Sequence, residues 1–196
     1  MKFPAVAFIA ALSGSAIAAA PDGYTVTDLD WVFKTPSGES ITLYGTLEEV
    51  TEEFQSLYPS TKLKRRNANS DKHELLTRQW EGASYECIDS KHPVHGWEPA
   101  DYGRIQEGWN YLWDLEGQPG HGPGPAACAR VSCSHNSGIY WCNDNDHAVT
   151  LNSWGDLARG AAELCNLCSS AGIRNKCGGQ LFHPDGYNVF ITNDSC

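Results

Sequence analysis

The sequence predicts an α+β fold: a two-layer α/β sandwich in which two helices cover an antiparallel sheet and disulfides fasten the layers together. Segments with alternating apolar residues are typical of strands, and segments with helical spacing of apolar residues interrupt them. The cysteines are even in number and follow a hydrophobic N-terminus, which is typical of a disulfide framework in a secreted protein. The sequence leaves their pairing open. They are Cys87, Cys128, Cys133, Cys142, Cys165, Cys168, Cys177 and Cys196.

Residues 1–18 have the features of a secretory signal peptide. Lys2 supplies the positive end, an apolar run follows, and Ala16-Ile17-Ala18 forms a small-residue cleavage box. The apolar run is shorter than the roughly 20 residues that a membrane-spanning helix needs. We therefore expect a secreted, extracellular and monomeric protein without stable membrane insertion.

Residues 19–66, here called the leader segment, predict a small strand–strand–helix unit without cysteine. Alternation over residues 24–33 and 40–44 predicts two strands. Thr46 and Glu49 have the spacing of a capping box at the start of a helix. Because so small a unit has little core of its own, we expect it to dock on the cysteine-rich part or to assist its folding. The apolar stripe of the helix comprises Leu47, Val50, Phe54 and Leu57.

A basic run ends the leader segment, and the polar stretch 67–83 after it predicts a linker. Lys64, Arg65 and Arg66 form the dibasic pairs that processing proteases of the secretory pathway cleave. The leader segment is therefore a candidate propeptide. The alternative is a solvated linker that stays intact, and the sequence favours neither.

The cysteine-rich domain, residues 84–196, contains two predicted helices. The first starts at Asp101 and ends by Gly117, and its apolar residues recur every three or four positions. Ser153 caps the second, with Asp156 three residues later, and we expect Gly172 to terminate it. Residues 118–125, between the helices, are rich in glycine and proline and predict an irregular loop.

Five strands are predicted around these helices. Asp185-Gly186 is a strong hairpin sequence between the last two strands. The resulting order is strand, helix, strand, strand, helix, strand, strand, which contains a split βαβ arrangement. The predicted strands are 84–88, 128–133, 138–142, 179–183 and 187–193.

Three phrases in this domain, at residues 102–108, 128–134 and 139–145, resemble stretches of small secreted proteins from filamentous fungi. The element order resembles the fold of fungal killer toxins and the related necrosis-inducing effectors. This resemblance implies a secreted effector or toxin that binds a host or competitor target. It implies no catalytic residue and no cofactor. The lysine-dependent surface loop of the killer toxins has no match here, so the resemblance does not extend to channel blocking.

Several other motifs have a structural interpretation that we prefer. The net charge of −10 argues against a nucleic-acid partner. His92 and His95 have the spacing of half a zinc site, but disulfides are the better use of Cys87. Cys165 and Cys168 have redox spacing but lie at a helix C-terminus, so we expect structural half-cystines with different partners. Asn143-Asp144-Asn145-Asp146 predicts a polar turn rather than a calcium loop.

Two alternatives to a protein-binding effector remain open at the level of the sequence. A small ribonuclease needs two titratable groups near one phosphate, and the spacing does not bring the candidates together. A cell-wall polysaccharide would stack on exposed aromatic rings. Asn193 is the single N-glycosylation acceptor. The ribonuclease candidates are His135, His147, His183 and Glu163, and the surface recognition candidates are Trp97, Trp113 and His121.

Overall fold

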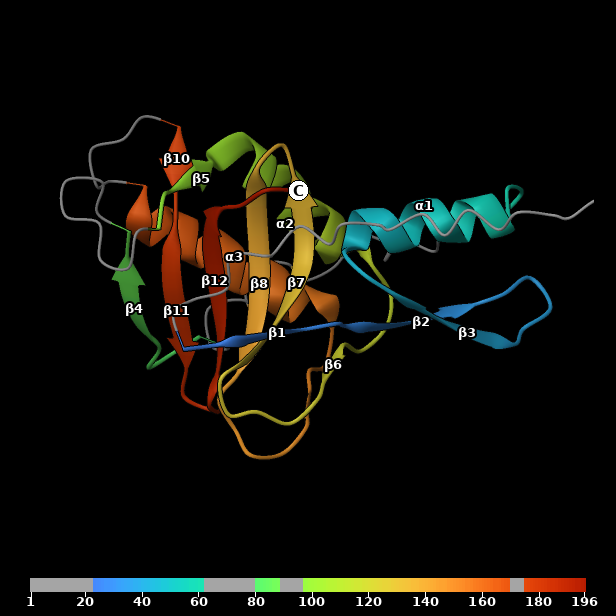
Figure 1. Ribbon diagram of the computed structural model, residues 1–196, viewed down its shortest axis with the longest axis horizontal. Coiled ribbons are helices and arrows are strands. Elements are labelled where there is room, and N and C mark those ends of the chain that lie inside the picture. Colours follow the sequence, from blue (N-terminus) through green and yellow to red (C-terminus); the bar gives the residue numbers. More distant parts are fainter. Residues whose placement is uncertain (1–22, 62–79, 89–96, 170–174) are drawn as a thin grey trace, which may run out of the picture.

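The computed structural model describes residues 23–61, 80–88, 97–169 and 175–196. Several predictions lie outside these ranges: the signal peptide, the dibasic run at Lys64–Arg66, residues 67–79 of the linker, the paired histidines His92 and His95, and the helix terminator Gly172. Figure 1 shows a central sheet from which one helix and a two-stranded ribbon project together to one side.

A six-stranded sheet forms the centre of the molecule. Its neighbours pair antiparallel except at one edge, where β1 runs parallel to β7 (Thr25 opposite Ala127), so the sheet is mixed rather than wholly antiparallel. The difference arises because the leader segment adds a strand to the cysteine-rich domain. The strand order is β1 (Thr25–Thr27), β7 (Ala127–Ser134), β8 (Ser137–Asn143), β12 (Tyr187–Asn193), β11 (Gly179–His183) and β4 (Ser84–Cys87).

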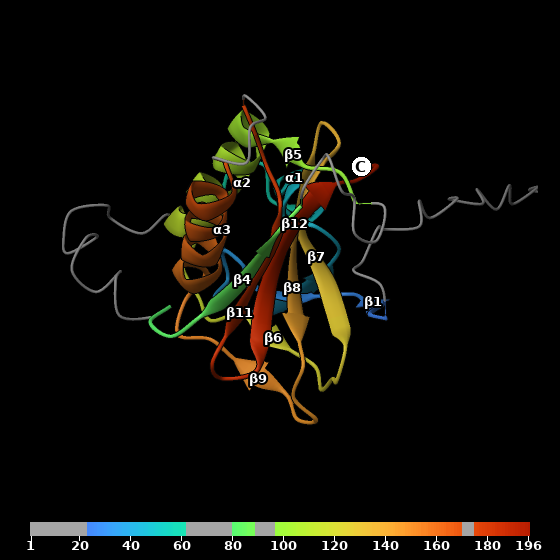
Figure 2. The ribbon, with the colours of Figure 1, turned by 90° about the vertical axis from the view of Figure 1, so that its left-hand side faces the viewer.

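Two of the three helices cover one face of this sheet. Figure 2 shows α2 (Tyr102–Asp114) and α3 (Trp154–Cys168) side by side on that face. The third, α1 (Leu47–Leu57), lies beside a separate ribbon formed by β2 (Asp30–Lys34) and β3 (Ser40–Tyr44). The protein is therefore a mixed α/β fold with a multistranded sheet and, within the described residues, three helices.

The helices begin where the sequence predicts. Thr46 and Glu49 form a reciprocal capping box, in which the Thr46 backbone N–H donates to the Glu49 carboxylate at 2.7 Å. Asp101 accepts from the first turn of α2. The Asp156 carboxylate accepts from both the backbone N–H and the hydroxyl of Ser153 at the start of α3. The backbone N–H donors in these contacts have no partner within the helix itself.

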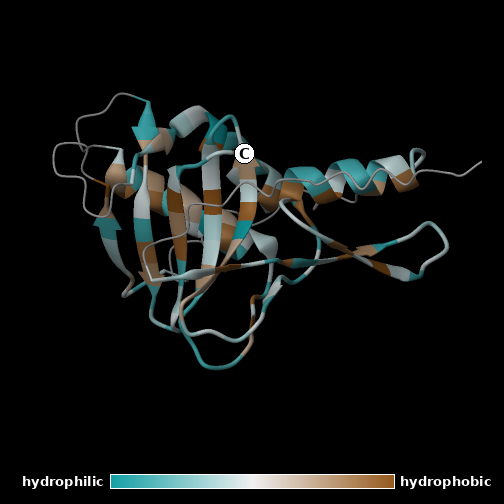
Figure 3. Ribbon diagram, viewed as in Figure 1, coloured by the Kyte–Doolittle hydropathy of each residue, from teal (hydrophilic) through white to brown (hydrophobic). Residues whose placement is uncertain are grey.

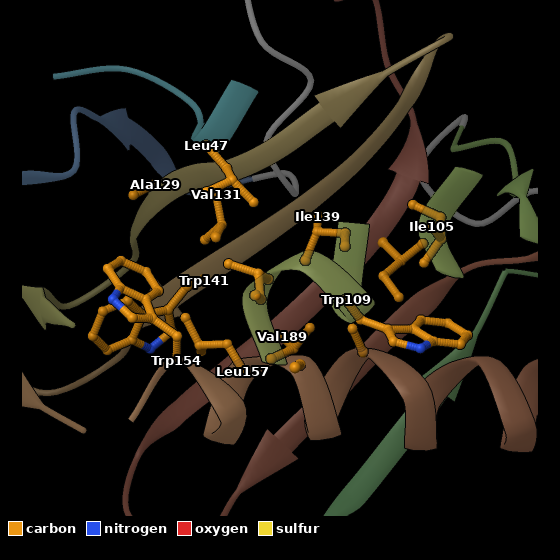
Figure 4. Packing of buried hydrophobic residues seen from close by; sticks show 14 of the residues in the cluster. Leu47, Ile105, Trp109, Ala129, Val131, Ile139, Trp141, Trp154, Leu157 and Val189 are labelled. Carbon is orange, nitrogen blue, oxygen red and sulfur yellow. The ribbon is translucent and has the colours of Figure 1, made fainter. Parts of the chain in front are cut away.

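The core lies between the sheet and the helices α2 and α3. Figure 4 shows Leu157 of α3 and Val189 of β12 facing each other in this layer, with Trp109 of α2 nearby. Brown, apolar segments mark the central strands in Figure 3. Both faces of these strands are buried: Val189 and Ile191 of β12 belong to this core, whereas Phe190 belongs to a smaller apolar cluster. Helix spacing and strand alternation thus bring their apolar faces to one common interface.

The end of the predicted linker belongs to this core. Trp80 is only 8% exposed, and its Nε1 donates to the backbone carbonyl of Asp156 at 3.3 Å. Its ring also packs edge-on against His183 and Tyr187. A large aromatic side chain with a satisfied polar atom is a core residue rather than part of a solvated linker.

All eight cysteines are paired, which confirms the predicted disulfide framework. The partners of Cys165 and Cys168 differ, also as predicted. The disulfides join Cys87 to Cys168, Cys128 to Cys142, Cys133 to Cys196, and Cys165 to Cys177. They fasten α3 to β4 and β10 (Lys176–Cys177), β7 to β8, and β7 to the C-terminus.

The leader segment packs against the cysteine-rich domain through specific contacts. The Glu48 carboxylate of α1 accepts from the Ser132 hydroxyl at 2.5 Å and from the backbone N–H of Cys133 at 3.0 Å. These contacts hold the N-terminal turn of α1 against β7. Because β1 also pairs with β7, two elements of the leader segment contact the same strand of the cysteine-rich domain.

Candidate functional site

A cleft of about 1420 Å³ opens between the β2–β3 ribbon and the loop after α2. We call it the β2 cleft. One wall consists of residues 30–36 of β2 and the turn that follows it, and the opposite wall consists of residues 115–118 and 120–123 with Ala148 and Thr150. Trp154 lies between the two walls. The cleft thus combines a part of the leader segment with a part of the cysteine-rich domain.

Two stacked indoles form the floor of the β2 cleft. The rings of Trp31 and Trp154 lie 4.1 Å apart between centroids and are nearly parallel, at 5°. The Trp31 Nε1 donates to the backbone carbonyl of Gly45 at 2.8 Å, which fixes the ring relative to the end of β3. Alternation along β2 directs Trp31 and Phe33 inward and leaves Val32 66% exposed. The floor is therefore apolar and is held by ring stacking and one hydrogen bond.

The loop wall has a sequence rich in glycine and proline, and hydrogen bonds to neighbouring segments hold its backbone in place. Its short strand β6 (Gly120–His121) pairs with β9 (Val149–Thr150). The Leu151 backbone N–H donates to the Pro119 carbonyl at 3.0 Å, and the Asn143 side-chain amide donates to the Gly122 carbonyl at 2.8 Å. These bonds satisfy backbone groups of the glycine- and proline-rich segment that would otherwise have no partner.

His121 lies in this wall and not on the surface where the sequence suggested it. Its side chain is only 4% exposed because the ring packs edge-on against Trp141, at 5.0 Å between centroids. Its Nδ1 lies 2.9 Å from the Gly122 carbonyl oxygen. Burial lowers the pKa of His121, partly offset by that carbonyl, so the neutral ring is favoured. Its Nε2 has no hydrogen-bond partner among the described residues.

The β2 cleft is acidic. Asp28, Asp30 and Glu116 line it, and the one basic side chain among its lining residues is Lys34. The Lys34 ammonium donates to the Ser40 hydroxyl at 2.8 Å, across the ribbon. Carboxylates on both walls of one cleft favour a ligand that carries positive charge.

The other surface recognition candidates lie elsewhere and contact protein neighbours. Trp97 is half-buried and packs edge-on against Phe190, on the sheet face opposite α2 and α3. Trp113 is half-buried on α2, with the Arg159 guanidinium 5.5 Å from its ring centroid. The predicted glycan acceptor Asn193 is partly buried, and its amide donates weakly to Glu98 at 3.4 Å.

A second, polar pocket of about 490 Å³ borders the same loop region, and sequence spacing gave no indication of it. His147 and His183 both line it, together with Asp156 and Asp185. The His183 ring is stacked on Tyr187, with 4.3 Å between ring centroids. Two of the ribonuclease candidates therefore share a pocket. The other two do not line it: His135 contacts the Ser134 hydroxyl in the β7–β8 turn and Glu163 lies on α3.

The face of the sheet opposite α2 and α3 carries a buried polar cluster that is structural. The Asp194 carboxylate accepts from the Tyr140 hydroxyl at 2.5 Å and from Arg130 at 3.2 Å. Burial and the nearby carboxylate raise the pKa of Tyr140. In the same layer, burial and Asp144 raise the pKa of Tyr24 to about 12. These groups pair with one another and line neither cleft.

No group of three or more histidine, cysteine or acidic side chains in the described ranges is placed to hold a metal ion. Among the same residues, no helix has the length and apolar character to cross a membrane.

No family model, curated protein or solved structure matches the chain. The fold and the site thus define a disulfide-bonded α/β protein with an acidic, aromatic-floored cleft. Four disulfides are typical of extracellular proteins.

Acid is expected to weaken the fold through His121. Because the folded state lowers the pKa of this group, the unfolded chain binds the proton more readily, and the neutral ring's contribution to stability is lost as the pH falls below about 6.5. Urea unfolding at about pH 7.5 and about pH 5.5 measures the effect. A His121→Phe variant should show a weaker pH dependence. The control His147→Gln, at a side chain 70% exposed, should keep that of the wild type.

Proposed function

We propose that this protein is a secreted effector or toxin-like protein of fungal type, which acts by binding a host or competitor target and not by catalysis. The β2 cleft is the observation that carries the proposal. Its floor is fixed by stacked indoles, its loop wall by hydrogen bonds, and its charged groups stand at the rim. A preformed concave site with a few charged groups on an apolar base is typical of ligand recognition.

The disulfide framework supports secretion and a rigid binding surface. The proposal includes the killer-toxin-like split βαβ arrangement for residues 84–196. The order of the elements longer than two residues, β4, α2, β7, β8, α3, β11, β12, supports it. Such a small stapled scaffold depends on its disulfides for stability outside the cell.

Infiltration of the purified protein into plant tissue tests the proposal, with inhibition of fungal growth measured in parallel. We expect the native protein to cause cell death or growth inhibition in at least one assay. Reduced and alkylated protein should be inactive, because it loses the fold that forms the cleft. Equal activity of the native and the reduced protein would contradict the proposal, as would inactivity of the native protein in both assays.

The polar pocket favours one second candidate, a ribonuclease. Two histidines in one pocket are the groups that general acid and base catalysis of RNA cleavage requires. Against it, Asp156 and Asp185 line this pocket and no lysine or arginine among the described residues does, which is unfavourable for a phosphate backbone. An RNA degradation assay decides: cleavage that His183→Gln abolishes would establish this activity, and no cleavage above buffer would exclude it.

Cell-wall polysaccharide binding is tested separately. In a pull-down with insoluble chitin or glucan, binding that Trp113→Ala abolishes would assign the surface of α2 to carbohydrate. If the protein bound no such polymer, a protein would remain as the expected class of target.

A further inference from the structure

The β2–β3 ribbon presents an unpaired strand edge to the β2 cleft. Within the described residues β2 pairs with β3 alone, in the register Asp30 opposite Tyr44 to Lys34 opposite Ser40. Every residue of β2 lines the cleft, whereas no residue of β3 does. The outer edge of β2 therefore faces the cleft. At such an edge, alternate residues carry backbone donors and acceptors without a strand partner.

The opposite wall leaves room for another strand. Residues 120–122 pair with β9 and with Asn143, and no backbone bond joins this wall to β2 among the described residues. The cleft volume of about 1420 Å³ exceeds the roughly 300–1,000 Å³ of a small-molecule site. A five-residue strand paired along β2 would extend about 17 Å. The cleft is thus large enough for a short extended peptide.

Charge and exposed apolar side chains specify what such a peptide should carry. Asp28, Asp30 and Glu116 against Lys34 give the lining residues a net negative charge. Val32 and Tyr44 are 66% and 60% exposed on the open face of the ribbon. A strand beside β2 would lay alternate side chains next to this face. Asp30 shares this face with Val32 and Tyr44, whereas Trp31 and Phe33 face the other way. The peptide residues at every second position should therefore include both basic and apolar side chains.

We propose that the β2 cleft binds an extended basic segment of a partner protein, which adds to the β2–β3 ribbon as a third strand. Main-chain hydrogen bonds to β2 supply part of the affinity, and the acidic rim supplies selectivity for basic sequences. This inference rests on the proposed function, since it names the ligand class of the same cleft.

An array of random eight-residue peptides, probed with the full mature protein, tests the inference. We expect the bound peptides to be enriched in lysine and arginine. The variant Asp30→Asn with Glu116→Gln should bind the best peptide at least tenfold more weakly. The matched control, Glu81→Gln with Glu86→Gln, removes the same charge from exposed positions at the β4 edge and should bind like the wild type. No enrichment in basic residues, or equal loss in both variants, would overturn the inference.

Backbone methylation of the peptide separates strand addition from side-chain contact alone. Methyl groups on alternate peptide nitrogens give two versions of the best binder, only one of which blocks the donors that face β2. One version should lose binding, and the other should retain it. Equal behaviour of the two versions would exclude strand addition.

The array also includes a synthetic peptide of residues 62–69, which is the basic run of this chain. If this peptide bound more tightly than every other peptide, the proposal of a separate partner would be overturned.

Comparison with the tissue assay keeps the two proposals apart. Cell death that persists in Asp30→Asn with Glu116→Gln would uphold the proposed function and remove the cleft from it. Selective binding of basic peptides by a protein inactive in both tissue and growth assays would uphold the inference and contradict the proposed function. If the protein bound a soluble chitin oligosaccharide and none of the peptides, the cleft would be assigned to carbohydrate and the inference would be overturned.

Discussion

A chain that begins at Asn67 is expected to lose most of its folding stability. The leader segment contributes β1, the floor residue Trp31 and the buried face of α1 to the fold. Truncation of one buried tryptophan alone costs about 3–5 kcal/mol, which is comparable to the whole stability of many domains, about 5–15 kcal/mol. Urea unfolding of this chain and of the full mature chain measures the difference. Addition of a peptide of residues 19–61 should restore part of the loss.

A single substitution tests the same contacts if the shortened chain does not fold at all. Glu48→Gln, in the full chain, weakens the contacts with Ser132 and Cys133 and should cost about 1.5–3 kcal/mol, because hydrogen bonds to a charged group are lost. Glu52→Gln, at an exposed position of the same helix, should change the unfolding midpoint little. Equal stability of the full and the shortened chain would show that the leader segment is dispensable for folding.

Removal of the disulfide between Cys87 and Cys168 is expected to be the most costly disulfide loss. It joins residues separated by 81 positions, whereas Cys165 and Cys177 are separated by 12. Because a cross-link restricts the unfolded chain more when the loop is longer, alanine at both positions should cost about 4.5 kcal/mol for the first pair and about 3 kcal/mol for the second. Guanidinium unfolding of the two double variants tests this order, and the reverse order would contradict the loop-entropy account.

Local rules account for most of the elements that the sequence predicts. The starts of α1 and α3 follow from capping boxes at Thr46 and Ser153, which are contacts between residues three positions apart. The hairpin around Asp185-Gly186 forms as the turn sequence indicates. These features depend on neighbours in the sequence, so a single chain is enough to find them.

Non-local pairing explains what the sequence could not predict in the fold. The alternation over residues 24–33 suggested one strand, but the structure divides it. Thr25–Thr27 pairs with β7 and Asp30–Lys34 pairs with β3. Alternation shows that a segment is extended and half-buried, yet it carries no information about which strand lies beside it. The parallel pairing of β1 depends on a contact about 100 residues away in sequence.

The sequence did not predict the β2 cleft either, because the cleft joins segments that lie far apart in the chain. The β2 cleft combines Asp30 and Trp31 with a loop wall that starts at Leu115, and no motif links them. The glycine- and proline-rich sequence predicted an irregular backbone, which the structure shows apart from the short strand β6. Irregular loops are usually exposed, so this sequence did not indicate a wall of a cleft. His121 is buried because its loop is held against Trp141, a tertiary contact without a sequence pattern.

The parallel strand β1 also has a consequence for the behaviour of the protein in concentrated solution. β7 is eight residues long and almost wholly buried, and a long apolar strand with an open edge invites pairing with another molecule. The leader segment covers part of that edge with three residues, two of them threonine, so the edge left to solvent is shorter and more polar. Loss of the leader segment would therefore expose the edge of β7 and favour aggregation of the chain through self-association along β7.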